Sequence, residues 1–442
     1  MIMSNLLFAR LQMAMLLGFH IIFACVGMVM PFLMVAAHGL WLKTKEPVYY
    51  EMTRAWSKGV AILFATGAVS GTVLSFELGL LWPTFMEHAG PIFGMPFSLE
   101  GTAFFIEAIA IGFYLYGWNK VGPFIHWLSG WLVGIAGVAS GIFVVAANGW
   151  MNSPSGFDWI NGKAYHIDPI KALFNAAWFS QSLHMTIAAF AALGFAVVGI
   201  HAYFLLKEPK NVFHAKAIKI AIWFAVMAAL LQPISGDYSA KDIARRQPIK
   251  LAAAEADFNT QHYAPLCIGG IPDMARRKVN YDIEIPGGLS FLAFGRLDSQ
   301  VKGLDDFPRD NWPPVAVVHY AFELMVACGM FLAAVGLIFV VGSFKNRDIL
   351  SKRWFLRLLV FCAPLGFIAL ESGWTVTEVG RQPWIIYGIM KTRDAVTPMP
   401  GLIVPFIAIA LLYLFLAVVV TWLMVRQFKS ISKKSYETNN QV

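Results

Sequence analysis

Two glutamates lie inside an apolar stretch of the sequence, where an ionised side chain is costly. Glu100 and Glu107 are seven residues apart, so a helix places them on one face, separated by roughly 10 Å along its axis. A charge in lipid is tolerated when it is paired, protonated or coordinated, so the pair predicts a proton relay or a metal site. Carboxylates bonded to neighbouring Ser or Trp groups are the structural alternative. Ser140 and Asn148, in the next apolar stretch, add polar positions of a kind that is also common where helices pack.

Two histidines, His20 and His184, are also surrounded by apolar residues. Each can be a buried histidine that bonds a carbonyl, or a ligand of a metal or haem iron. His184 lies roughly 16 Å into a helix expected to begin near residue 173, and Met325 lies roughly 14 Å into one beginning near residue 316. A methionine in an apolar helix usually only packs, but a His/Met pair is a known axial set for a low-spin haem. The shared depth makes Met325 a candidate ligand.

The run GWTVTEVGRQPW at residues 373–384 is the most distinctive in the chain. Glu378 and Arg381 are three residues apart within it, and Trp374 and Trp384 bracket them. One interpretation is an interfacial ion pair within an aromatic belt. The other is that Glu378 ligates a haem iron while Arg381 binds a propionate. The pattern alone leaves these two interpretations balanced.

The composition requires all these groups to belong to a membrane protein. Hydrophobic residues make up 58% of the 442 and charged residues only 14%, which is too apolar for a soluble chain. A bilayer core about 30 Å thick needs about 20 apolar residues per helix, and lipid offers no partners for free backbone groups. We therefore expect an all-α polytopic membrane protein with about nine transmembrane helices. Their approximate ranges are 10–36, 56–82, 97–118, 123–148, 173–206, 215–233, 316–342, 354–376 and 402–425.

The basic residues of the short loops predict the orientation. Most fall on one side of the membrane, namely Lys43, Lys45, Arg54, Lys58, Lys120, Lys207, Lys210, Lys216, Lys219, Lys345, Arg347, Lys352, Arg353, Arg357, Arg426, Lys429, Lys433 and Lys434. The other side has Arg10, Lys163, Lys171, Arg381, Lys391 and Arg393. The positive-inside rule then places the N-terminus outside and the C-terminus in the cytoplasm. Because the net charge of +8 has this origin, we expect no nucleic-acid partner.

One long polar segment, residues 234–315, interrupts the helices on the outer side. It is rich in charge, Gly and Pro, and long structureless connections are usually functional or disordered, so we expect a substrate loop. The loop separates helices one to six, in residues 1–233, from helices seven to nine, in residues 316–425. A polar cytoplasmic tail follows at residues 426–442. The four cysteines are scattered and form no CxxCH motif, so any haem must be held non-covalently.

Over essentially its full length the sequence resembles subunit I of the cytochrome bd quinol oxidases. The resemblance rests on the GWxxxExGRQPW run, on EGTAFFIE at 100–107, on ANGWM at 147–151 and on KLAAAE at 250–255. It implies the haem-bearing subunit of a respiratory terminal oxidase in a prokaryotic cell membrane. Such a subunit oxidises membrane quinol on the outer side and reduces dioxygen to water. The proton motive force then arises from vectorial proton uptake without pumping.

The resemblance also implies three cofactors: a low-spin haem b, a high-spin haem b and haem d, a chlorin. His184 and Met325 match the axial ligands of the low-spin haem. His20, Glu100 and Glu378 match residues that ligate or contact the other two haems, and the resemblance does not say which residue serves which haem.

The remaining matched positions have roles other than ligation. Arg381 and Trp374 match the surroundings of the haems, as a propionate partner or as part of the site electrostatics. Glu107, together with Ser140 and Asn148, matches a proton path toward the dioxygen site. Lys250 and Glu255 match the quinol-binding loop, where a Glu can accept a quinol proton and a Lys can polarise the ring oxygen.

Two features depart from the family pattern. Members often have Arg two residues before the methionine ligand, whereas this chain has Glu323. A carboxylate there tends to lower the haem potential unless it is protonated or paired. In addition, Glu100 and Glu107 are seven residues apart where some members have eight, which suggests a helix bulge in one of the two forms.

The implied partners are membrane quinol, dioxygen and a second membrane subunit, with a small single-helix subunit as a further option. Two other classes compete with the oxidase. A secondary transporter would use Glu100, Glu107 and Glu378 for coupling protons, but the sequence shows neither paired broken helices nor an internal repeat. A diheme quinone-linked cytochrome without oxygen chemistry is the third interpretation. A reduced-minus-oxidised absorption spectrum separates the three.

Overall fold

The computed structural model describes residues 2–345 and 348–439. Within them, nine spans are long and apolar enough to cross a membrane, which confirms the predicted all-α polytopic class. The spans are α1 (Ile2–Thr44), α2 (Pro47–Leu81), α3 (Pro83–Tyr116), α4 (Pro123–Asn152), α6 (Trp178–Lys207), α7 (Val212–Arg246), α10 (Val315–Lys345), α11 (Arg353–Cys362) continued by α12 (Leu365–Val379), and α14 (Ile403–Asn439).

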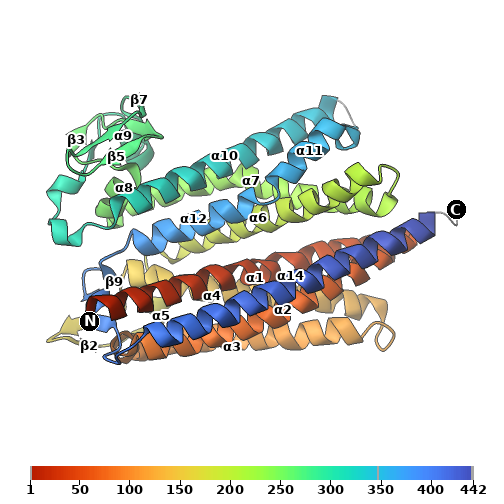
Figure 1. Ribbon diagram of the computed structural model, residues 1–442, viewed down its shortest axis with the longest axis horizontal. Coiled ribbons are helices and arrows are strands. Elements are labelled where there is room, and N and C mark those ends of the chain that lie inside the picture. Colours follow the sequence, from red (N-terminus) through yellow and green to blue (C-terminus); the bar gives the residue numbers. More distant parts are fainter. Residues whose placement is uncertain (1, 346–347, 440–442) are drawn as a thin grey trace.

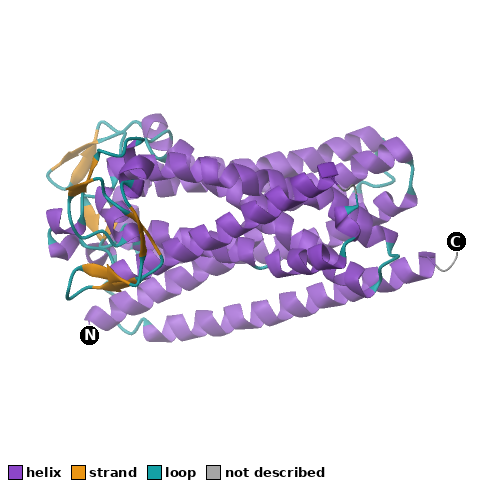
Figure 2. Ribbon diagram, turned by 90° about the horizontal axis from the view of Figure 1, so that it is seen from above, coloured by secondary structure: helices purple, strands orange, loops and turns teal. Residues whose placement is uncertain are grey.

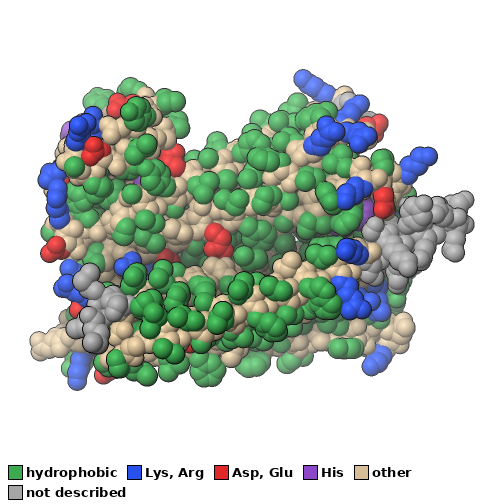
Figure 3. All heavy atoms as spheres, in the orientation of Figure 1, with side chains coloured by type: hydrophobic (Ala, Val, Ile, Leu, Met, Phe, Trp, Pro, Cys, Tyr) green, Lys and Arg blue, Asp and Glu red, His purple; other side chains and the backbone are tan. Residues whose placement is uncertain are grey.

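The long helices run side by side along the longest axis (Figure 1). In that view, α6, α7, α10, α11 and α12 form an upper group, and α1, α2, α3, α4 and α14 form a lower group. All strands gather at the end that also holds the start of α1 (Figure 2). We call this the strand end and the other the far end. Apolar side chains cover the helices, Lys and Arg gather at both ends, and acidic atoms appear beside a hollow between the two groups (Figure 3).

Proline begins several helices at the position that tolerates it. Pro47, Pro83 and Pro123 each occupy the first turn of α2, α3 and α4, where no backbone N–H has an intrahelical acceptor. Small residues then let the helices approach closely. A Cβ added at Gly194 of α6 would lie 2.8 Å from Ala225 Cα of α7, and one at Gly366 of α12 would lie 2.4 Å from Ala192 Cα of α6.

Several predicted boundaries are wrong. The sixth span was expected to end at residue 233, but α7 continues through Pro233 to Arg246. The fifth was expected to begin near residue 173, whereas α6 begins at Trp178 after the separate helix α5 (Pro169–Leu173). α14 extends to Asn439, so most of the tail predicted from residue 426 is helical, and residues 440–442 lie outside the described residues.

The long connection was expected to be structureless, and that expectation is also wrong. It contains α8 (Pro248–Glu255), α9 (Gly288–Phe294) and two 3-10 turns (Leu304–Asp306 and Arg309–Asn311). Three antiparallel strand pairs complete it: β3 (Gln261–His262) with β8 (Gln300–Val301), β4 (Leu266–Ile268) with β7 (Ile283–Ile285), and β5 (Ile271–Asp273) with β6 (Lys278–Asn280). Each short strand pairs with one other strand of the loop, so the backbone groups that face each other are hydrogen-bonded.

The remaining short elements also lie at or near the helix ends. β1 (Asp158–Ile160) pairs with β2 (Lys163–Tyr165), and β9 (Trp384–Ile386) pairs with β10 (Met390–Lys391). The short helix α13 (Thr392–Ala395) follows β10, and a 3-10 turn (Ile349–Ser351) precedes α11. The β9–β10 hairpin begins at Trp384, the last residue of the distinctive run at residues 373–384.

Candidate functional site

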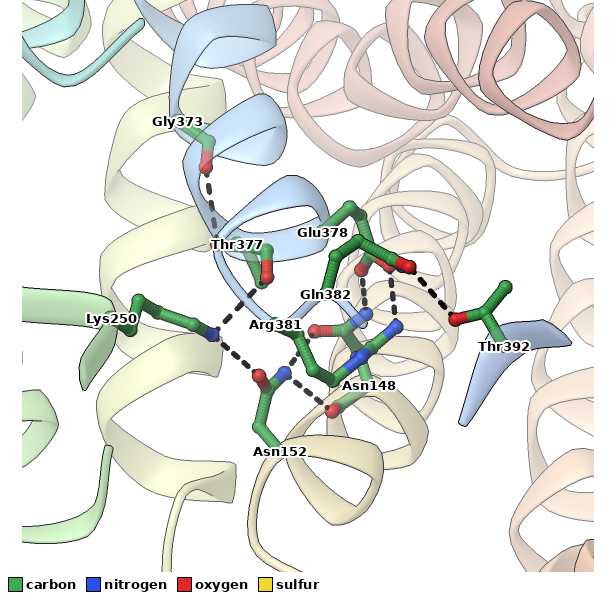
Figure 4. A network of polar contacts seen from close by, with 9 residues as sticks. All are labelled: Asn148, Asn152, Lys250, Gly373, Thr377, Glu378, Arg381, Gln382 and Thr392. Atoms are coloured by element: carbon green, nitrogen blue, oxygen red, sulfur yellow. Dashed lines mark hydrogen bonds and ion pairs between the residues drawn. The ribbon is translucent and has the colours of Figure 1, made fainter. Parts of the chain in front are cut away.

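A group of hydrogen bonds joins α4 and α12 at the strand end (Figure 4). The Glu378 carboxylate accepts from Asn148 Nδ2 through Oε1 and from Arg381 Nη2, at 2.6 Å, through Oε2. Asn152, one turn beyond Asn148, donates from Nδ2 to the Asn148 carbonyl at 2.9 Å and to its Oδ1 at 3.0 Å. Glu378 is partly buried, and each of its oxygens thus has a donor.

Lys250 extends this group to α8. Its Nζ donates to Asn152 Oδ1 at 2.6 Å and to the Thr377 carbonyl at 3.1 Å. Burial and the Arg381 charge lower the pKa of Lys250 to about 7, and the Glu378 charge partly opposes them. The structure therefore places Lys250 inside the Glu378 group, where its amine already has two acceptors. Its predicted contact with a quinol ring oxygen stays a prediction.

Arg381 has hydrogen-bond donors that this group does not use. Its side chain is only 2% exposed, and Nε and Nη1 have no hydrogen-bond partner among the described residues. Buried guanidinium donors without acceptors are costly, so the site favours an anion that can occupy both. A haem propionate has that chemistry. The residues present therefore fit the predicted propionate contact.

The two predicted histidine ligands have matching surroundings. His184 Nδ1 lies 2.9 Å from Ser235 Oγ, and that hydroxyl donates to the Gln232 carbonyl. His20 Nδ1 lies 2.9 Å from Ser70 Oγ, whose hydroxyl donates to the Gly67 carbonyl. Because each serine proton is already committed, its oxygen must accept from the imidazole, so both histidines carry their proton on Nδ1. Nε2 of each ring then has the lone pair that an iron ligand needs. The lone pair of His184 Nε2 accepts from Gln232 Nε2 at 3.1 Å, so Gln232 would have to give up this contact to an iron.

Glycines keep space beside the predicted ligands. A Cβ added at Gly71 would lie 2.8 Å from His20 Cε1, and one at Gly236 would lie 3.6 Å from His184 Cε1. A Cβ at Gly373 would lie 3.0 Å from Met325 Sδ. Each of these glycines directly follows a serine in the sequence. The recurring Ser-Gly pair is a signal that the sequence analysis missed.

Glu100 and Glu107 of α3 lie against its neighbours α4 and α1. Ser140 Oγ of α4 donates to Glu100 Oε1 at 3.1 Å. Glu107 is buried, and its Oε1 would lie 2.8 Å from a Cβ at Gly27 of α1 and 3.2 Å from one at Gly137 of α4. α3 is α-helical throughout Pro83–Tyr116, so the seven-residue spacing fits a regular helix.

Glu255 ends α8 in a different environment. It is 2% exposed, and neither carboxylate oxygen has a hydrogen-bond partner in the described chain. Burial, together with the charges of the nearby Glu323 and Asp257, raises the pKa of Glu255 to about 8. Burial also raises the pKa of Asp257, to about 6. Both carboxyl groups therefore have a pKa close to neutral pH, which suits a residue that accepts a proton.

Glu323, the departure noted in the sequence, has a partner. Its Oε2 accepts from the Gly269 backbone N–H at 3.1 Å, which ties the loop to α10 two residues before Met325. Gly269 and Gly270 have φ values of 71° and 99°, in the left-handed region that glycine adopts without strain. The carboxylate is thus held by a neutral donor and not by a cation.

The structure unites some predicted residues and leaves others apart. It joins Asn148, Glu378, Arg381 and Lys250 in one group, and Glu100 with Ser140, while Trp374 is partly buried against the core. The equal depth expected for the two predicted low-spin ligands no longer follows from counting residues. His184 lies roughly 9 Å from the start of α6, and Met325 lies roughly 15 Å from the start of α10. Asn152, Ser70 and Ser235, which contact the predicted residues, were not predicted from the sequence.

Comparisons with known proteins agree on one family. Residues 8–432 match the model described as "Cytochrome bd terminal oxidase subunit I". The chain is 36% identical over 435 residues to the putative cytochrome bd menaquinol oxidase subunit I of Bacillus subtilis (strain 168), covering 97% of each. It is 31% identical over 445 residues to the cytochrome bd ubiquinol oxidase subunit 1 of the same organism, covering 97% of this chain and 94% of the relative.

A solved structure gives the same result. The bd oxidase from Geobacillus thermodenitrificans superimposes with a TM-score of 0.91 at 36% identity, covering 96% of this chain and 98% of that one.

Proposed function

Because this chain belongs to the cytochrome bd terminal oxidase subunit I family, we propose that it is the subunit that oxidises membrane quinol and reduces dioxygen to water. It is a multi-pass protein of the bacterial cytoplasmic membrane and a quinol:oxygen oxidoreductase. Haem is its class of cofactor, and a second membrane subunit is its partner. The proposal includes an outer N-terminus, a cytoplasmic C-terminus and an outer-side quinol loop in residues 234–315.

The observation that carries the proposal is the pairing of the partly buried Glu378 with the buried Arg381 within the GWxxxExGRQPW run. Its guanidinium keeps two donors for an anion, and its carboxylate is held by Asn148. A purely interfacial ion pair has no need of a 2% exposed arginine with two free donors. The arrangement supports the haem interpretation over an aromatic-belt ion pair.

We assign the residues to the three proposed haems as follows. His184 and Met325 hold the low-spin haem b, and His20, Glu100 and Glu378 hold or contact the high-spin haem b and haem d. Bound haem supplies electron transfer and oxygen reduction, which no side chain here can perform. Ser235 and Ser70 fix the ligating tautomers of the histidines, and Arg381 neutralises a propionate.

The side chains then account for the protons. Two quinols release four electrons and four protons, and one dioxygen takes up four of each to form two waters. Glu255, with no partner and a pKa of about 8, accepts a quinol proton at the strand end. Glu107 and then Glu100, bonded to Ser140, deliver protons from the far end. Release and uptake on opposite sides produce the proton motive force without pumping.

A variant spectrum tests the proposal. His184→Ala and Met325→Leu should each remove the low-spin haem b signal from the purified complex while the other haem signals remain. A far-red chlorin band in the wild-type reduced-minus-oxidised spectrum should identify haem d. A full low-spin spectrum in either variant contradicts the ligand assignment, and a colourless wild-type complex contradicts the function.

A further inference from the structure

Glu371 is a carboxylic acid in the middle of α12 that none of the roles above uses. It lies seven residues before Glu378, so both side chains share one face of α12, roughly 10 Å apart along the axis. Its Oε1 is fully buried and has no hydrogen-bond partner among the residues that the structure describes. Glu378, in contrast, has a donor on each oxygen. Glu371 therefore has no partner that would hold it permanently ionised.

Its neighbours place it between two proposed haem sites. A Cβ added at Gly18 of α1 would lie 3.3 Å from Glu371 Oε2, and Gly18 is two residues before His20. On its own helix, Gly373 is two residues further along and lies beside Met325 Sδ. Glu371 thus lies between the helix that carries the low-spin ligand Met325 and the helix that carries His20.

Glu371 and Glu378 of α12 are arranged like Glu107 and Glu100 of α3, the two glutamates of the proposed proton path. Glu107 of α3 lies against Gly27 of α1, seven residues from Glu100, and Glu371 of α12 lies against Gly18 of α1, seven residues from Glu378. In each pair the residue nearer the strand end is hydrogen-bonded, by Ser140 or by Asn148 and Arg381. The residue nearer the far end faces a glycine that leaves room at its carboxyl group.

We propose that Glu371 is a proton-accepting residue of the oxidase, a role that rests on the proposed haem function. When an electron from quinol enters the region between α10 and α1, the Glu371 carboxylate takes up one proton from the aqueous phase and becomes a neutral acid. When dioxygen removes that electron, the acid releases the proton. The net charge of the buried region is then the same before and after each electron transfer, which limits the cost of placing charge in a low dielectric.

The helices around Glu371, which are α1, α6, α10 and α11, contribute other titratable groups. The Cys25 thiol of α1 is buried. The other titratable groups within these spans are Arg10, His20, His38 and Lys43 of α1, His184, His201, Tyr203 and Lys207 of α6, His319, Tyr320, Glu323, Cys328 and Lys345 of α10, Arg353, Arg357 and Cys362 of α11, and Glu378 of α12. No described Lys or Arg forms an ion pair with Glu371.

Redox-induced infrared difference spectroscopy on the purified complex tests the proposal. Reduction of the wild type should produce a protonated-carboxyl band, which Glu371→Gln loses and Glu371→Asp shifts. The midpoint potential of the haems should fall with rising pH in the wild type, because reduction takes up a proton, and should fall less steeply in Glu371→Gln. Glu77→Gln is the matched control, since Glu77 is a span carboxylate that accepts from Gln12 Nε2 at 2.8 Å. It should leave both readouts unchanged.

The haem spectrum is recorded first for each variant. A wild type without haem would defeat the proposed function itself. A Glu371→Gln complex with intact haem and an unchanged carboxyl band would overturn only the role of Glu371. If Glu371→Gln does not assemble, the band in Glu371→Asp decides: a shifted band supports the role and an unshifted one refutes it.

Discussion

Two ionisable side chains of the short helix α8, five residues apart, have opposite surroundings. Lys250 is buried and donates to Asn152 Oδ1 and to the Thr377 carbonyl. Glu255 is equally buried, yet neither of its oxygens has a partner in the described residues. A buried group with partners holds the helices in place, while one without them is available to a ligand or a proton. We therefore predict that Lys250 mainly joins α8 to α4 and α12, and that Glu255 is the residue that takes part in the chemistry.

Removing the Lys250 amine should have the largest effect, and that effect should be on stability. Lys250→Met leaves Asn152 Oδ1 and the Thr377 carbonyl without a donor, which should lower stability by about 3 kcal/mol. Thermal unfolding of the detergent-solubilised complex measures this. Lys241→Met is the control, because the partly exposed Lys241–Asp237 pair should contribute under about 1 kcal/mol. Equal effects of the two substitutions would contradict a structural role for Lys250.

Removing the acid on the other side should affect chemistry and not stability. Glu255→Gln abolishes proton acceptance and should lower quinol turnover by about 100-fold. Oxygen consumption from an artificial one-electron donor should be retained, because the haem sites are untouched. Glu284→Gln, at an exposed position of β7, is the control. Normal quinol turnover in Glu255→Gln would remove Glu255 from the mechanism.

The pH profile should sharpen the assignment with a smaller effect. With a pKa of about 8, Glu255 is mostly protonated at neutral pH, and only its smaller ionised fraction can accept a quinol proton. Its basic form increases as pH rises through 8, so kcat/KM for quinol should rise over the same range. The profile of Glu255→Gln should be flat there. A wild-type rate that falls through this range instead would show that another group limits proton release.

The smallest effect is expected at a residue that acts through a ligand. Ser235→Ala removes the acceptor that fixes the His184 tautomer and should weaken retention of the low-spin haem by about 10-fold. Haem content after gel filtration measures this. Ser239→Ala is the control on the same helix, because the Ser239 hydroxyl has no partner among the described residues. Equal haem loss in both variants would argue against orientation by Ser235.

The amino-acid sequence by itself determined much of the architecture. Lipid provides no hydrogen-bond partners, so nine apolar stretches had to become helices, and the structure confirms them. The errors are at the helix ends. α7 continues past Pro233 to Arg246, and its last turns are polar, which hydropathy excludes from a span. The cost of charge in lipid likewise identified Glu100, Glu107 and Glu378 without any coordinates.

Only the tertiary structure decided which of these groups meet. Lys250 is distant in sequence from Asn152 and Thr377, and the serines that hold His20 and His184 are on other helices. Glu371 gained a possible role only when α12 was seen to place it against Gly18. Helical periodicity gives the face of each residue along its own helix. The rotation and approach of neighbouring helices, which depend on side-chain packing along their whole length, decide its partners.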